Sequence, residues 1–132
     1  MKPITQKITD LITVLILVGG CIALCGYSYK QYQLHKTAAF HQRSIDTVEA
    51  VSSGMKEYKV RHGEFPACSD FPAMVSPQSP LVKEGLVPPN LSLRDYWGNP
   101  YSGHSNQSSF ALNYSGSPTD PYNFPPITLH SQ

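Results

Sequence analysis

The feature that most constrains this chain is an uncharged apolar run near its N-terminus, residues 11–29 (LITVLILVGGCIALCGYSY). These nineteen residues, at about 1.5 Å of rise per helical residue, match the ~30 Å hydrocarbon core of a bilayer. The run therefore predicts a transmembrane helix. It separates a short N-terminal cytoplasmic segment, residues 1–10, from about a hundred following residues, which leave room for one modest domain.

The charges beside the run orient it only weakly, because Lys2 and Lys7 precede it while Lys30 and Lys36 follow it. Two other fates of the N-terminus stay open. A cleaved secretory signal is one, although no small-x-small site follows the early apolar stretch. Lipidation at Cys21 is the other, because residues 18–20 (VGG) are small residues before a cysteine, but the residues after it stay apolar and form no polar tether.

Residues 30–62 are typical of an amphipathic soluble helix. No proline occurs between Ile4 and Phe65, whereas eleven of the twelve prolines come later, so the first half of the chain can be helical throughout. Gly54 weakens the helix slightly, and Gly63 followed by a proline predicts an end near His62 with the glycine in a left-handed cap conformation. One apolar stripe repeats at spacings of three and four: Ile45, Val48, Val51, Met55 and Tyr58.

Residues 63–116 are expected to form a small, loop-rich β domain, because prolines and polar residues divide them into short elements. Two strands are predicted, around residues 99–102 and 109–113, and the polar connection 103–108 makes them a hairpin. Since an isolated two-stranded sheet is marginal in water, this sheet must pack on the apolar stripe of the helix. Residues 117–132 are expected to be a Pro-rich tail, which is either a surface tail or a partner-dependent segment.

Charge and cysteine content limit the classes of partner. Ten Lys and Arg against nine Asp and Glu give a net charge of +1, which lacks the basic footprint needed for nucleic acid. Cys21 and Cys25 lie in the apolar run and only Cys68 lies in the soluble part. A disulfide within that part is excluded unless the helix contributes a cysteine, and Cys68 alone does not identify the compartment.

The most distinctive string of the chain is residues 95–101, DYWGNPY. Gly98 can adopt a positive φ, and Pro100 pushes Asn99 towards an extended conformation. Trp97 and Tyr101 offer large surfaces that can anchor a turn. We interpret the string as a structural corner. A ligand-binding loop is the alternative, but Asp95 is the one titratable carboxylate in the string and no catalytic apparatus is visible.

The order of three segments resembles type II secretion pseudopilins, the major pseudopilin most closely, and related type IV pilin-like proteins. The segments are the helix end 58–66 (YKVRHGEFP), then 85–88 (GLVP), then 95–101, and the resemblance covers roughly residues 8–116. It implies subunits that are inserted in the inner membrane and assembled into a helical fibre by packing of their N-terminal helices. The implied function is mechanical.

Thr13 and Asp10 are the two residues near the N-terminus that we compare with the family's assembly glutamate. Residues 11–16 (LITVLI) are similar to the family's LIEVL run, with Thr13 in place of the glutamate. The resemblance implies that this glutamate pairs with a neighbour's N-terminal amine inside the lipid, where a low dielectric strengthens the contact. Asp10 offers a carboxylate three residues earlier, or is an interfacial acid favoured by the helix dipole. The glycine that a prepilin peptidase requires before the run is absent.

No cofactor and no catalytic residue are expected. Major pseudopilins often bind calcium after the sheet, but residues 96–132 contain one charged residue, Asp120, and a hard cation needs several anionic oxygens. An enzyme would draw on His62, Cys68 and His104 as a nucleophilic pair or as zinc ligands. Their spacing matches no such motif.

The sequence therefore predicts an α+β protein in which a long N-terminal transmembrane-plus-soluble helix packs on a small antiparallel sheet with irregular loops. The predicted function is that of a pseudopilin-like structural subunit of a type II secretion or type IV pilus-like assembly. It would be single-pass in the bacterial inner membrane, with a periplasmic C-terminal domain, and its partners would be other pilin-like subunits and inner-membrane assembly proteins. The alternative is a stand-alone membrane-anchored or lipidated periplasmic binding module that does not polymerise.

Overall fold

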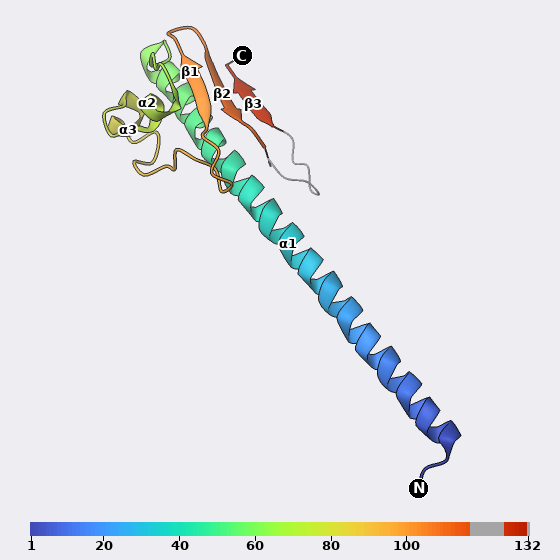
Figure 1. Cartoon of the computed structure of the whole chain (residues 1–132). Coiled ribbons are helices and arrows are strands. Elements are labelled where there is room, and N and C mark those ends of the chain that lie inside the picture. Colours follow the sequence, from blue (N-terminus) through green and yellow to red (C-terminus); the bar gives the residue numbers. More distant parts are fainter. Residues whose placement is uncertain (117–125, 132) are drawn as a thin grey trace. The chain divides into compact units, whose positions relative to one another are not determined.

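The computed structural model describes residues 1–116 and 126–131. Within them the chain forms three helices and three strands, so the predicted α+β class is confirmed (Figure 1). The elements are α1 Ile4–His62, α2 Phe71–Val75, α3 Pro80–Lys83, β1 Ser102–Ser105, β2 Phe110–Tyr114 and β3 Ile127–His130. The chain divides into two compact units, Met1–Lys36 and Thr37–Gln132.

The first unit contains the N-terminal part of α1. The helix begins directly after Pro3, whose carbonyl oxygen accepts hydrogen bonds from the amides of Gln6 and Lys7 at 3.0 and 3.2 Å. Most of the predicted N-terminal segment 1–10 is therefore helical. Every residue from 1 to 30 is exposed, so the apolar side chains of this helix bury nothing within the chain and need another apolar environment.

In the second unit α1 buries one face. The predicted stripe is confirmed there, because Val48, Val51 and Met55 are 1%, 0% and 0% exposed, while Ile45 and Tyr58 lie half-buried beside them. Three small residues complete the buried face: Ser44, Ser52 and Gly54. The predicted end of the helix is also confirmed, since α1 stops at His62 and Gly63 follows with φ 80°.

The sheet is antiparallel, in the order β1-β2-β3. Phe110, Leu112 and Tyr114 alternate along β2 and are buried in the same core as the α1 stripe. The predicted hairpin is confirmed, but its first strand begins at Ser102 and not at 99. Pro100 has no amide hydrogen to donate to a ladder, and the residues before it are closed into a turn.

The strand β3 falls in the segment that the sequence predicted to be a tail. It pairs with β2 in the register Leu112↔Leu129, and Ser131 continues the contact with a hydrogen bond from its amide to the Phe110 carbonyl at 3.1 Å. The expectation of a surface tail is therefore corrected for Ile127–His130. The other part of that expectation, residues 117–125 and 132, lies outside the described residues.

Two short helices and their loops cover the rest of the core. Asp70 caps α2, with Oδ1 accepting from the Ala73 amide at 2.8 Å, and Ser79 caps α3 in the same way at Leu81. Phe71, Met74 and Leu81 place their side chains in the core at 1%, 0% and 0% exposure. These loops therefore complete the hydrophobic core that the small sheet cannot close by itself.

Candidate functional site

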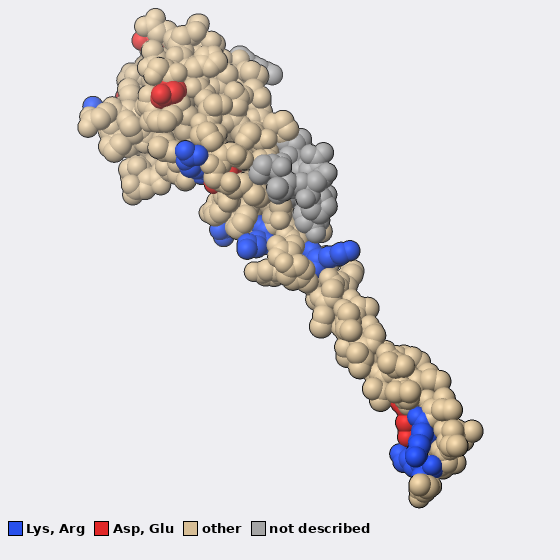
Figure 2. Space-filling view, viewed as in Figure 1, with Lys and Arg blue, Asp and Glu red and all other residues tan. Residues whose placement is uncertain are grey.

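The apolar part of α1 is the first candidate functional surface. Among the described residues, α1 is the one helix that is long and apolar enough to cross a membrane. Its most apolar part lies near the N-terminus and is not buried within the chain. In Figure 2 this part of α1 appears as an uncharged stretch with Lys and Arg side chains at both ends. It is a candidate membrane span, and a signal sequence would have the same composition.

The two residues considered for assembly each have a partner within their own helix. The Asp10 carboxylate lies 3.1 Å from the Lys2 ammonium, with both side chains more than half exposed. The Thr13 hydroxyl donates to the Thr9 carbonyl at 2.9 Å, as exposed threonines in helices commonly do. No acidic side chain occupies position 13. Cys21, the candidate for lipidation, is exposed on the same helix.

The second candidate site is the turn 95–101, which Asp95 organises. Its carboxylate Oδ1 accepts hydrogen bonds from the amides of Trp97 and Asn99, both at 2.9 Å. The Asp95 amide donates to the Asn99 carbonyl at 2.8 Å, and Gly98 closes the turn with φ 85°. The side chain of Arg94 donates to the Gly98 carbonyl at 2.7 Å. Asp95 is only 7% exposed, and among the described residues its Oδ2 has no hydrogen-bond partner.

Aromatic side chains dock this turn on α1. Phe40 of α1 stacks on Tyr96 with ring centroids 4.7 Å apart, and it meets Trp97 edge-on at 6.1 Å. Trp97 also stacks on Tyr114 of β2 at 6.3 Å. Arg43 of α1 lies 5.4 Å from the Tyr96 ring centroid and donates to the Tyr96 hydroxyl at 3.3 Å. The turn thus connects α1 to the sheet, and such geometry suits a fixed structural corner.

Burial shifts two titratable groups beside the turn. Tyr114 is 1% exposed, and burial raises the pKa of its phenol to about 12, opposed by a hydrogen bond with Ser44 and assisted by the charge of Asp95. Burial also lowers the pKa of His41, whose Nδ1 lies 3.1 Å from the Tyr114 hydroxyl. Both groups are therefore uncharged at neutral pH, and their hydrogen bond joins α1 to the end of β2.

The three residues considered for catalysis are engaged in separate structural contacts. His62 pairs with Glu84 through its Nε2 at 2.6 Å. Cys68 is buried, its backbone pairs with Ser105, and burial raises the pKa of its thiol, with Ser105 opposing and Asp70 assisting the shift. His104 is exposed on β1.

Metal ligands are equally sparse. In the part of the chain that the structure describes, no three His, Cys, Asp or Glu side chains gather as a metal would need. Asp120, the acid considered for calcium, lies outside that part.

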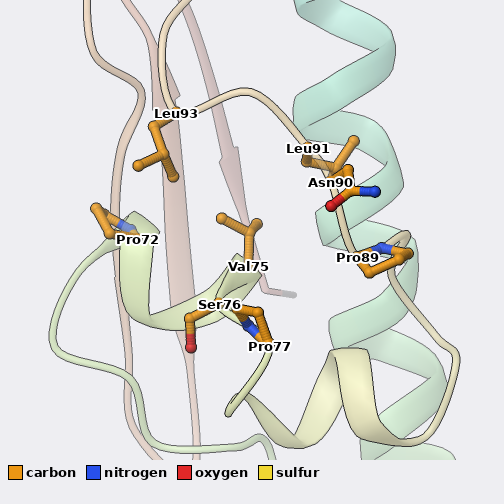
Figure 3. A pocket seen from close by; sticks show the side chains of 8 residues that line it. All are labelled: Pro72, Val75, Ser76, Pro77, Pro89, Asn90, Leu91 and Leu93. Carbon is orange, nitrogen blue, oxygen red and sulfur yellow. The ribbon is translucent and has the colours of Figure 1, made fainter.

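An open groove of about 520 Å³ lies between α2 and the segment 89–93 (Figure 3). In Figure 3, Pro72 and Leu93 lie on one side of the groove and Pro89 and Leu91 on the other, with Val75 between them. Ser76 and Asn90 add the few polar atoms. The groove has the mainly apolar lining of a site for an apolar side chain, and the described residues that line it include no titratable group.

Sequence reasoning missed the groove and the α1 side of the turn. Phe40 carried no signal, because it lies ahead of the apolar stripe in a mixed segment and its role depends on the distant Tyr96. The groove is built from α2 with the two residues that follow it and from the segment 89–93, whose approach depends on tertiary packing that no local pattern encodes.

Comparison with protein-family models, with curated proteins and with solved structures finds nothing that matches this chain.

Proposed function

We propose that this protein is a non-enzymatic, membrane-anchored structural subunit that packs with other pilin-like subunits through α1, in the manner of type II secretion pseudopilins. The proposed location is the bacterial inner membrane, single-pass, with the C-terminal domain in the periplasm. The other proposed partners are inner-membrane proteins of a secretion or pilus-like assembly.

The observation that carries the proposal is that α1 has an exposed apolar part and a second part that packs into the core of the C-terminal unit. The helix Ile4–His62 exposes its apolar side chains in the first unit, and from Ser44 onward the same helix supplies one face of the core of the second unit. An exposed apolar helix can be covered by lipid or by equivalent helices of other copies, and both coverings occur in a fibre that grows out of a membrane. The second unit supports a structural, non-enzymatic role, because its polar side chains mainly make hydrogen bonds that stabilise its own turns and helix ends.

Oxidative cross-linking in membranes tests this packing. Cys21 and Cys25 are exposed on α1, whereas Cys68 is buried. Membranes that contain the full chain are treated with a mild copper oxidant, and disulfide-linked oligomers are expected to persist when the chain is diluted with excess lipid. A Cys21→Ser/Cys25→Ser variant is the matched control and should form none. Loss of the oligomers on dilution would mean random collision and would contradict the proposal.

A second candidate function is a stand-alone anchored module, and the contacts of Asp10 and Thr13 favour it. Asp10 is paired with Lys2, and Thr13 with the helix backbone, so neither offers an unpaired carboxylate to a neighbour's amine. Thr13→Glu compared with the neutral Thr13→Gln separates the two functions. An assembling subunit should gain incorporation into a sheared fibre fraction only with the glutamate, whereas a stand-alone module should respond to neither change.

A further inference from the structure

Two histidines lie close together on the outer face of the sheet, away from the turn and the groove. His104 of β1 pairs with Ala111 of β2, and Ala111 pairs in turn with His130 of β3. Directly opposite residues of antiparallel strands share one face, so the two histidines flank Ala111 on that face. Both are exposed, while the alternate residues Phe110 and Leu112 of β2 are buried. The face that carries the histidines is therefore the one that points away from the core.

The register of the sheet sets the distance between the two histidines. Paired Cα atoms of antiparallel strands lie roughly 4.5 or 5.5 Å apart, so the Cα atoms of His104 and His130 are about 10 Å apart. A histidine holds a metal ion at roughly 2.1 Å from its ring nitrogen, and hence at roughly 6 Å from its own Cα. Two histidines can therefore share one ion when their Cα atoms lie up to about 12 Å apart. The two imidazoles can meet above Ala111.

The surroundings of Ala111 suit a cation. The alanine side chain is a single methyl group, so it leaves the space between the two imidazoles open. The three strands contain no Lys or Arg, and no cation on these strands repels a metal ion. Ser102, Asn113 and Thr128 form the neighbouring row of the same face. Their side-chain oxygens can accept hydrogen bonds from water molecules on the ion.

We propose that His104 and His130 bind one divalent transition metal ion of the kind that favours imidazole, namely Cu²⁺, Ni²⁺ or Zn²⁺. The two neutral imidazoles supply one nitrogen each, and water completes the coordination. Catalytic and structural zinc centres have three or four protein ligands. With two, this site binds its ion less tightly and exchanges it readily. Of the three ions, Cu²⁺ binds most tightly.

The bound ion connects the two edge strands of the sheet. β2 lies between β1 and β3 (Figure 1), and β3 has four residues. An ion held by His104 and His130 joins β1 to β3 directly. Because the unfolded chain does not hold the two histidines together, the ion stabilises the folded sheet by mass action. The inference is independent of membrane anchoring and of subunit assembly.

Metal titration of the full chain in detergent tests the proposal. The parent chain and all variants carry Cys21→Ser and Cys25→Ser, because these exposed thiols bind the same ions. Calorimetry with Ni²⁺ should give one ion per chain, and electron spin resonance with Cu²⁺ should show coupling to two imidazole nitrogens. His104→Gln and His130→Gln should each weaken Ni²⁺ binding at least about tenfold, since even the loss of a contact that supports a metal ligand costs roughly 10- to 100-fold.

Two matched variants separate this pair from other ligands. Ala111→Leu keeps both histidines but fills the space between them, and it should weaken binding as the histidine variants do. His35→Gln removes an exposed histidine of α1 and should leave binding unchanged. Ni²⁺ should also raise the midpoint of denaturant unfolding of the parent chain but not that of His104→Gln.

The proposal fails if either His104→Gln or His130→Gln keeps the parent affinity, or if His35→Gln loses it. A ratio of one ion to two chains would also overturn it, because the ligands would then come from two copies. Circular dichroism without metal should show the parent fold in every histidine variant, since the replaced side chains are exposed. A loss of binding then reports the missing ligand and not a lost sheet.

Discussion

Replacing Asp95 tests whether one buried carboxylate holds the turn that docks on α1. Its Oδ1 accepts two backbone hydrogen bonds, from Trp97 and Asn99 at 2.9 Å, while its buried Oδ2 has no partner among the described residues. Asp95→Ala removes both bonds and leaves the two amides without that acceptor. Asp95→Asn keeps an oxygen in the Oδ1 position and replaces the unpaired oxygen with an uncharged amide group.

The two substitutions should differ clearly in their cost. Each hydrogen bond to a charged acceptor contributes about 1.5 to 3 kcal/mol, so the gross loss in Asp95→Ala is roughly 3 to 6 kcal/mol. The same substitution also removes the buried Oδ2, which lacks a partner, and so relieves a desolvation penalty of about 1 to 3 kcal/mol. The net expectation is a loss of about 3 kcal/mol in the free energy of unfolding for the alanine. For the asparagine it is about 1 kcal/mol or less, because both backbone bonds survive.

The assay is denaturant unfolding of the full chain in detergent, followed both by Trp97 fluorescence and by far-ultraviolet circular dichroism. The chain has one tryptophan, so the fluorescence reports the turn and the dichroism reports the whole fold. Asp46→Ala is the control, since that exposed carboxylate accepts a hydrogen bond from the Gln42 side chain at 2.9 Å and from no other side chain that the structure describes, and it should change stability little. If Asp95→Asn costs as much as Asp95→Ala, the argument from the Oδ1 acceptor fails.

Two further predictions concern His41 and Cys68. Because burial lowers the pKa of His41 from 6.5, the unfolded chain takes up this proton first as the pH falls through 6.5, so the free energy of unfolding should decrease there. An NMR titration should place the His41 midpoint below 6.5, and a midpoint at or above that value would refute the expectation. The Cys68 thiol is buried and its pKa is raised, so iodoacetamide should modify it slowly in a Cys21→Ser/Cys25→Ser chain until denaturant is added. A native rate equal to that of the denatured chain would show that the thiol is accessible.

The helix and its buried stripe could be predicted because both depend on local, repeated signals. Proline-free sequence, apolar spacing of three and four and the glycine after His62 gave the element and its end, and α1 stops at that residue. β3 could not be predicted in the same way. Its four residues are too few to show a convincing alternation, because half-buried Ile127 and Leu129 are each followed by one exposed residue. They form a strand because they pair with β2.

The turn was recognisable from its residues, but its partners were not. Gly98 and Pro100 indicate a turn by their own backbone restrictions, and Gly98 has the positive φ that favours glycine. That Asp95 faces inward and that Tyr96 stacks on Phe40 are tertiary facts, which depend on residues more than fifty positions apart. Sequence spacing could not place the groove for the same reason, since its lining comes from α2 with the residues after it and from the segment 89–93.

Gly54 provides the sharpest case in which local reasoning gives the wrong sign. By helix propensity alone, Gly54→Ala in the middle of α1 should stabilise the protein by about 1 kcal/mol. In the structure an added Cβ would lie 2.6 Å from Val87 Cγ2 and 3.1 Å from the Leu86 carbonyl oxygen. Val87 is 1% exposed, so neither its side chain nor that backbone can move aside freely.

Overpacking of this kind costs about 1 to 3 kcal/mol, so Gly54→Ala should destabilise the domain by up to about 2 kcal/mol after the propensity gain is subtracted. Ser53→Ala, at the exposed neighbouring position of the same helix, is the matched control and should stabilise slightly. The midpoint of denaturant unfolding measures both. A Gly54→Ala midpoint above that of the unsubstituted chain would mean that the segment 86–87 does not pack on α1 as closely as described.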